Sequence, residues 1–314
     1  MKRLVRNLGV LLCIVVVLCS LYFGIFFMSV PAQYADNYNA SLIDKVDRLE
    51  SIDEPKIILV GNSNLAYGIN SELIEESMGM PVANLGLHGG LGNKFLERIA
   101  LLGINEGDLV IICHTDYSDK NELKQADLAW ITLENHWELW KIPDAKMWGE
   151  LLVALPDYTF NAMSLYLSGR GNQSSDEVYA RKAFNVYGDN VSHRESGRYE
   201  IEDSSVTVPE INDECVKRIN KLGEYCDTVG AKLVIAGYPI MVGEDTPNKD
   251  CYTLFQNELR DKMNCEIISD YEDYFFAKEY FYDGCLHMTN EGADLRTSQL
   301  IRDIEKMQSQ AIEK

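Results

Sequence analysis

Basic residues are scarce in this chain of 314 residues, which has 29 lysines and arginines against 49 aspartates and glutamates and a net charge of −20. Nucleic-acid phosphates repel so acidic a protein, which excludes nucleic-acid binding over a broad basic surface. The sequence also lacks a Cys-x-x-Cys pair and any compact cluster of cysteine and histidine. A zinc site is therefore not expected, and neither a metal nor another cofactor is predicted.

Charge is also missing from residues 8–30, which form a run of 23 apolar or small positions. This run is long enough to cross the hydrocarbon core of a bilayer. Lys2, Arg3 and Arg6 precede it, so the positive-inside rule places the N-terminus in the cytoplasm and the rest of the chain outside. A cleaved signal peptide is the alternative, because Val30-Pro31-Ala32 resembles a cleavage site. The run is longer than the apolar region of a signal peptide, which has about 7–15 residues, and this favours an uncleaved anchor.

The chain then divides into a connector and a body. Residues 1–31 are assigned to the cytoplasmic tip and anchor, 32–54 to a polar juxtamembrane connector, and 55–314 to one catalytic domain. The first 30 residues carry three positive charges and no negative one, so the net charge of the remainder is −23. Six of the eight cysteines lie in the body, where one or two disulfides would be compatible with an oxidising compartment. Their pairing cannot be read from the sequence.

Apolar runs alternate with helical patterns through most of the body. Strands are predicted over residues 56–60, 82–85, 109–113, 233–236 and 266–269, with a helical pattern between each pair and after the last. Asn70 is placed to cap the first of these helices, and Gly230 to end a later one. This alternation predicts an α/β fold with a parallel sheet covered on both sides.

The alternation is interrupted at about residues 119–208, which contain all four tryptophans. A long irregular segment in a compact domain is usually functional or disordered, and the aromatic content argues against disorder. We interpret it as an insertion packed over the carboxyl edge of the sheet, where ligands of such sheets bind. The alternative, to which we give equal weight, is that this segment only covers the sheet and makes no contact with a substrate.

Two short motifs carry the candidate chemistry. Gly61-Asn62-Ser63 directly follows the first predicted strand, and Asp283 precedes His287 by four residues. Ser63 is the candidate nucleophile, His287 its general base and Asp283 the carboxylate that orients the imidazole. The second glycine of a G-x-S-x-G elbow is missing after Ser63, so an α/β-hydrolase fold is not expected.

These motifs resemble blocks I, II and V of the SGNH/GDSL hydrolase superfamily, in the segments Gly61-Asn62-Ser63, Asn84-Leu85-Gly86-Leu87-His88-Gly89 and Asp283-Gly284-Cys285-Leu286-His287. The last segment, with Gly292 and Arg296-Thr297, looks like that of a membrane-anchored bacterial branch. Members of that branch often accompany membrane-bound O-acyltransferases in cell-envelope modification. The resemblance implies a three-layer α/β/α sandwich with a parallel sheet, the flavodoxin-like SGNH fold.

The resemblance also implies an oxyanion hole made by the backbone N–H groups of Ser63 and Gly89. One departure concerns the third donor, which the superfamily takes from the asparagine of a Gly-x-Asn-Asp motif. Here His114-Thr115-Asp116 follows the third predicted strand instead. Asn64 and His114 are the candidates for a substitute donor or a substrate contact, although each also has a structural interpretation.

Three functions are compatible with these observations. The first is a membrane-anchored O-acyltransferase that moves an acyl group, acetyl for example, onto a glycan or polyol acceptor outside the membrane. The second is an esterase that removes such groups through the same Ser-His-Asp triad and acyl-enzyme. The third is a non-catalytic accessory subunit that recruits an intramembrane O-acyltransferase, and the missing asparagine favours it slightly. The sequence leaves all three open.

Overall fold

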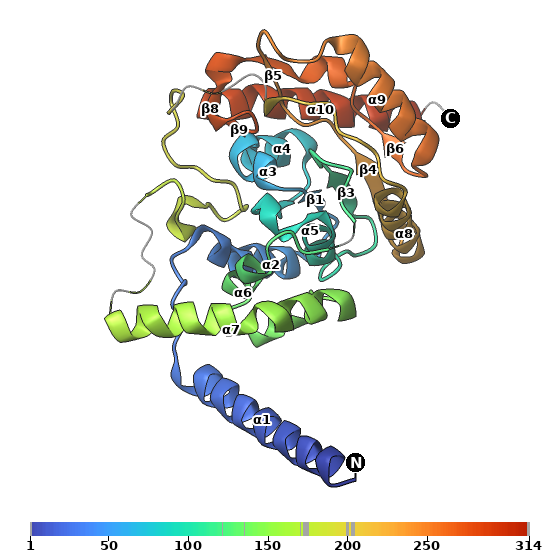
Figure 1. Ribbon diagram of the computed structural model, residues 1–314. Helices are drawn as coiled ribbons and strands as arrows, with labels where there is room; N and C mark the ends of the chain where they lie inside the picture. The colour runs from blue at the N-terminus through green and yellow to red at the C-terminus, as the bar shows by residue number, and fades with distance from the viewer. Residues whose placement is uncertain are drawn as a thin grey trace.

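A five-stranded parallel sheet forms the centre of the protein (Figure 1). Ile57 pairs with Val82 on one side and with Leu109 on the other, and every residue of the two central strands is buried. Strands covered on both faces can be apolar throughout, so the predicted α/β fold with a parallel sheet is confirmed. In this computed structural model the strands, in spatial order, are β2 (Val82–Asn84), β1 (Ile57–Val60), β3 (Leu109–Ile112), β4 (Lys232–Ile235) and β6 (Glu266–Ile267).

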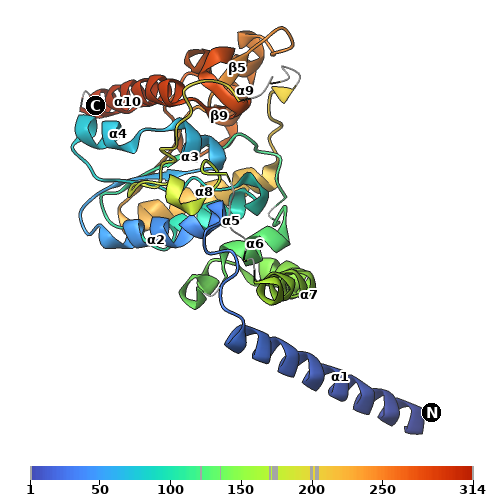
Figure 2. The same cartoon turned by 90° about the vertical axis from the view of Figure 1, so that its left-hand side faces the viewer.

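Helices pack against both faces of this sheet (Figures 1 and 2). The face that presents Ile57 and Leu59 shares its core with α4 (Ser71–Met78) and α10 (Asn290–Ile312). The opposite face, which presents Ile58 and Val60, shares its core with α2 (Leu42–Ser51), α5 (Asn93–Ala100), α8 (Asp213–Val229) and α9 (Lys249–Lys262). The structure describes residues 2–312 except 121, 135, 170, 172–175, 199–200 and 202–204.

Three smaller elements position the candidate site. The short helix α3 (Ser63–Gly68) directly follows β1, and the strands β8 (Phe281–Gly284) and β9 (His287–Met288) form an antiparallel hairpin before α10. A separate two-stranded parallel sheet pairs β5 (Ile240–Val242) with β7 (Phe275–Ala277).

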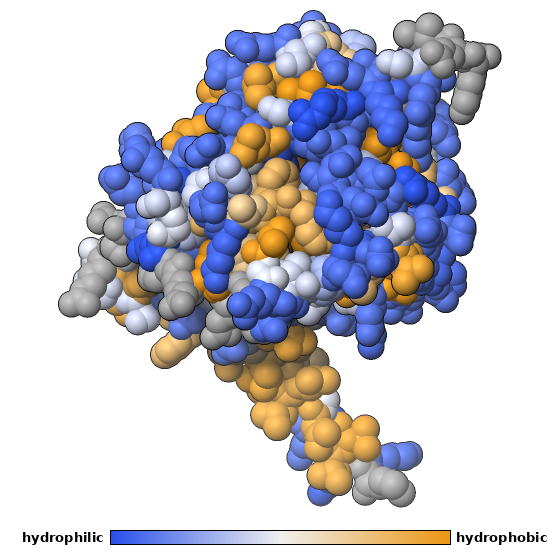
Figure 3. All heavy atoms as spheres, turned by 90° about the horizontal axis from the view of Figure 1, so that it is seen from above, coloured by the Kyte–Doolittle hydropathy of each residue, from blue (hydrophilic) through white to orange (hydrophobic). Residues whose placement is uncertain are grey.

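The N-terminal apolar run is a single helix, α1 (Lys2–Ser29), that is long and apolar enough to cross a membrane. Most of its side chains are exposed, and Figure 3 shows it as an almost continuous hydrophobic rod that extends from a mainly hydrophilic body. Its C-terminal part packs against the body, where Phe23, Phe26 and Phe27 join the hydrophobic core. The Phe26 ring lies 5.9 Å from that of Tyr158, and Phe27 contacts a cluster of three tryptophans, Trp130, Trp137 and Trp140.

In the described part of residues 119–208 the α-helices are α6 (Ala126–Thr132) and α7 (Ala145–Ser168). Their aromatic side chains form the surface on which the end of α1 rests. A later part of the segment packs against α3, where the N–H of Asn190 donates to the Ala66 carbonyl at 2.8 Å. The segment therefore links the apolar helix to the helix that begins with Ser63.

Candidate active site

Ser63 is the first residue of α3, immediately beyond the carboxyl end of β1. The turn between them is tight: a Cβ at Gly61 would lie 2.9 Å from the Cys113 carbonyl oxygen, so only glycine fits. Asn62 caps α3, because its side chain accepts a hydrogen bond from the N–H of Asn64 at 3.0 Å. The Gly61-Asn62-Ser63 sequence thus produces both the turn and the start of the helix.

The hairpin β8–β9 brings Asp283 and His287 together. The Asp283 Oδ1 lies 2.8 Å from His287 Nδ1, and His287 Nε2 lies 2.8 Å from Ser63 Oγ. With the carboxylate accepting from Nδ1–H, Nε2 is the ring nitrogen left to accept the serine proton. The two residues lie on paired strands, with Gly284 opposite His287. A tight hairpin explains how a spacing of four residues joins them.

Tyr67 packs against the imidazole ring of His287. Its ring centroid lies 4.3 Å from that of His287, and it is fully buried within α3. Arg194 connects this helix to the hairpin, since its guanidinium donates to the carbonyl oxygens of both Tyr67 and Met288. Burial lowers the pKa of Arg194 to about 10, which still leaves it charged at neutral pH. These contacts fix His287 relative to Ser63 and were not predicted from the sequence.

Two backbone N–H groups, those of Ser63 and Gly89, are candidate donors near the serine side chain. Ser63 is at the N-terminus of α3, and Gly89 begins a short 3-10 helix (Gly89–Leu91), so neither N–H is used inside its own helix. A Cβ at Gly89 would lie 3.5 Å from the Cβ of Asn62, which places this glycine against the residue before the nucleophile. The neighbouring His88 lies at the surface, where partial desolvation of its ring and the proximity of His287 lower the pKa of His88. This shift favours the neutral imidazole of His88.

The side chains of Asn64 and His114 are both fully buried. Asn64 donates to Asn62 and to the Cys113 carbonyl, and its oxygen accepts from Arg296 at 2.8 Å. His114 Nε2 lies 2.8 Å from Glu97 Oε1. The structure therefore does not bring either side chain to an exposed position beside Ser63.

Thr115 is a polar residue of this region that the sequence analysis did not single out as a candidate. It is partly exposed just beyond β3, and its Oγ1 accepts a hydrogen bond from Asn62 Nδ2 at 2.6 Å. Because the hydroxyl oxygen is engaged as an acceptor, its proton remains available for a further bond. The signal for Thr115 was its place after the third predicted strand, on the same sheet edge as Ser63.

A pocket of about 320 Å³ adjoins the triad. Asp283 and His287 line one part of it, and Tyr179, Cys285 and Leu286 supply an apolar surface. All eight cysteines, Cys285 among them, are free. Across the described ranges no group of three or more His, Cys, Asp or Glu side chains is arranged to hold a metal ion.

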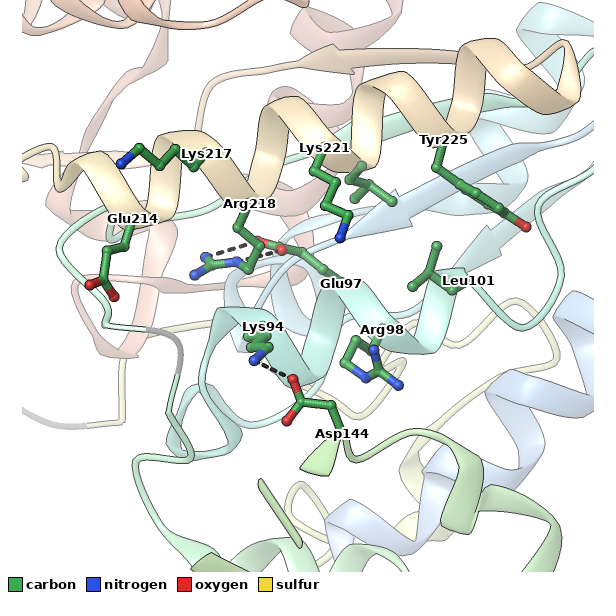
Figure 4. A pocket seen from close by; sticks show the side chains of 11 residues that line it. Lys94, Glu97, Arg98, Leu101, Asp144, Glu214, Lys217, Arg218, Lys221 and Tyr225 are labelled. Atoms are coloured by element: carbon green, nitrogen blue, oxygen red, sulfur yellow. Dashed lines mark hydrogen bonds and ion pairs between the residues drawn. The ribbon is translucent and has the colours of Figure 1, made fainter. Parts of the chain in front are cut away.

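A larger cavity, of about 630 Å³, lies between α5 and α8 and contains none of the triad residues (Figure 4). Its charged side chains largely pair with one another: Arg218 Nε donates to Glu97 at 2.6 Å, and Lys94 pairs with Asp144. Lys221 extends into the same space from α8. This cavity has basic and apolar walls but no candidate nucleophile.

Comparison with known protein families, with curated proteins and with solved structures finds no significant match for this chain. The resemblance to SGNH/GDSL hydrolases therefore depends on the motifs alone.

Proposed function

We propose that this protein is a serine esterase or O-acyltransferase of the SGNH/GDSL type, attached to the membrane by α1 with its body outside the cytoplasm. The observation that carries the proposal is the pair of 2.8 Å contacts joining Asp283, His287 and Ser63. The strand order β2-β1-β3-β4-β6, with helices on both faces, supports a flavodoxin-like three-layer sandwich. In such a fold Ser63 lies at the ligand-binding edge of the sheet.

In the first half-reaction Ser63 Oγ attacks the carbonyl carbon of an acyl ester while His287 Nε2 takes the hydroxyl proton. The carbonyl π electrons move to oxygen, and the N–H groups of Ser63 and Gly89 stabilise the resulting oxyanion. We assign the third donor to the hydroxyl of Thr115 rather than to Asn64 or His114. When the oxyanion collapses, the leaving alcohol takes the proton from His287 and Ser63 remains acylated.

In the second half-reaction His287 removes a proton from an incoming hydroxyl, whose oxygen attacks the carbonyl carbon of the acyl-enzyme. When this oxyanion collapses, the bond to Ser63 Oγ breaks and His287 returns the proton to that oxygen. Water as the attacking group gives an esterase, and a glycan or polyol hydroxyl gives a transferase. The pocket of about 320 Å³ beside Asp283 and His287 has room for an acyl group such as acetyl. Tyr179 in its wall supports a sugar acceptor, because aromatic faces suit carbohydrate rings.

The proposal is tested by treating the purified full chain with a fluorophosphonate and mapping the adduct by mass spectrometry. Ser63 Oγ should displace fluoride and carry the label, and Ser63→Ala should abolish labelling. Ser118→Ala is the matched control, since Ser118 is an exposed serine outside the site and its loss should leave labelling unchanged. A folded protein that is not labelled at Ser63 would contradict the proposal.

Turnover of an activated ester with and without a glycan acceptor then separates the two catalytic functions. Acylated glycan among the products identifies a transferase, and free acid alone identifies an esterase. The accessory-subunit alternative predicts instead that envelope acylation in cells persists undiminished in the Ser63→Ala variant.

A further inference from the structure

Helix α7 has an apolar surface on the side that does not pack against the body. Its buried side chains include Met147, Leu151, Leu155, Tyr158 and Ala162. On the opposite side four large apolar side chains are strongly exposed, with exposed fractions of 60% for Leu152, 82% for Val153, 72% for Phe160 and 76% for Leu167. A helix on an aqueous surface normally carries polar side chains there.

These exposed residues form one stripe. Val153, Phe160 and Leu167 recur every seven residues and lie along one side of the helix. Pro156 and the partly buried Met163 lie three or four residues from them on the same side, and Leu152 lies four residues before Pro156. None of the six residues is charged. We call this set, Leu152, Val153, Pro156, Phe160, Met163 and Leu167, the outer face of α7.

Helix α7 lies beside the point where α1 leaves the body. Phe26, in the last turn of α1, packs its ring 5.9 Å from Tyr158 of α7. Figures 1 and 2 show α7 at the boundary of the body, on the side from which α1 extends. Trp137, which contacts Phe27, is itself exposed there. Tryptophan is enriched at membrane–water interfaces, where an apolar ring and a polar N–H are both accommodated.

We propose that α7 lies in the interface of the same membrane that α1 crosses, with its outer face among the lipid acyl chains. The commitment to lipid follows from position, because α7 lies on the side of the body from which the apolar α1 extends and one apolar medium would cover both. The absence of charge on the face makes this contact hydrophobic rather than electrostatic. The inference depends on the proposed membrane attachment of α1 and is independent of the catalytic role of Ser63.

The test places a photoactivatable benzophenone amino acid at single positions of the full chain in phosphatidylcholine vesicles. Phe160 probes the outer face, Leu18 probes α1, and Tyr225, a half-exposed aromatic residue of α8, is the control on the body. After irradiation, mass spectrometry should find lipid adducts at positions 160 and 18 and none at 225. Yields at position 160 should be the same at low and high salt, since no charge on the face contributes.

Each other outcome has a distinct meaning. Adducts at position 18 but not at 160 would overturn the inference and leave the anchor intact. Cross-links from 160 to a second copy, or to another protein in native membranes, would overturn it by identifying a protein as the occupant. Lipid adducts at neither 18 nor 160 would refute the membrane attachment itself, whereas fluorophosphonate labelling of Ser63 would still report separately on the active site.

Discussion

At the scale of single residues, His287 is the most constrained side chain of the candidate site. Asp283 holds one ring nitrogen, Ser63 contacts the other, and Tyr67 packs on the ring face. Asp283→Asn should keep this shape but favour the wrong tautomer, because an amide can donate to Nδ1. We expect kcat to fall by about 10³–10⁴-fold with little change in KM, measured with a soluble activated ester. A loss of less than about tenfold would show that Asp283 does not set the tautomer.

Thr115 gives a second test at this scale. Thr115→Val preserves the shape of the side chain and removes the hydroxyl that we assign to the oxyanion. The expected loss in kcat is about 10²–10³-fold, the usual effect of removing one such donor. Thr115→Ser is the matched control and should stay within a few-fold of the wild type. If the valine variant has the same kcat and melting temperature as the wild type, a group other than Thr115 is the third oxyanion donor.

Local motifs were sufficient to single out Ser63, Asp283 and His287, which the structure brings together, because each sits in a short recognisable segment. Their catalytic roles stay predictions. The motifs were insufficient for Thr115, whose hydroxyl contacts Asn62 in the turn after β1. Asn64 and His114 have the right chemistry for donors, but packing places both in the interior. Residue type can be read from a sequence, whereas burial requires the tertiary contacts.

At the scale of elements, the sheet was predictable because its strands are apolar runs bounded by polar residues. The helix boundaries followed from capping chemistry: Asn70 accepts from the N–H of Leu73 at the start of α4, and Gly230 ends α8 with φ of 80°. The hairpin β8–β9 was missed because its strands have only four and two residues. Helix α7 gave no clean periodicity because it is apolar on both sides and contains Pro156.

Helix α10 carries a buried carboxylate whose effect on stability should depend on pH. Asp303 accepts hydrogen bonds from Ser269 at 2.5 Å and Tyr274 at 2.8 Å. Burial raises the pKa of Asp303 above its usual value, despite these donors. The folded state therefore favours the protonated form of Asp303. The stabilisation that this group gives the folded state is complete below the pKa of Asp303 in the unfolded chain, and it is lost as pH rises through the pKa of Asp303 in the folded state.

Asp303→Asn should remove that dependence, since asparagine cannot ionise and still offers an acceptor oxygen to Ser269 and Tyr274. We expect the free energy of unfolding of the variant, relative to the wild type, to increase as pH rises from about 4 to neutral. Urea unfolding of the full chain in detergent at a series of pH values measures this difference. A constant offset between the two proteins over that range would contradict a raised pKa.

At the scale of the whole molecule, charge and apolar surface have opposite effects on the affinity of the protein for a membrane. The remainder beyond residue 30 carries a net charge of −23, so anionic lipid headgroups repel it. Helices α1 and α7 lie on one side of this acidic body. With α7 attached as well as α1, the body would tilt less freely relative to the membrane than with α1 alone.

The distribution of basic residues predicts which side of the membrane the body occupies. Lys2, Arg3 and Arg6 lie at the start of α1, and no acidic residue accompanies them, so the N-terminus should remain in the cytoplasm. Protease added to intact spheroplasts should then digest the body, as followed by an antibody to its C-terminal helix. Replacing all three basic residues with glutamate should leave a larger fraction protected, because the charge bias that orients the helix is reversed.

The same fractions also distinguish an anchor from a cleaved signal. An anchor keeps the whole chain in the membrane pellet after a high-salt wash, and the intact mass includes residues 1–32. Cleavage after Ala32 would instead release a soluble body that begins at Gln33. That result would separate Phe26 and Phe27 from the tryptophan cluster, which would then be exposed in the mature protein. Because those rings pack closely against α6 and α7, we expect the helix to be retained as part of the folded structure.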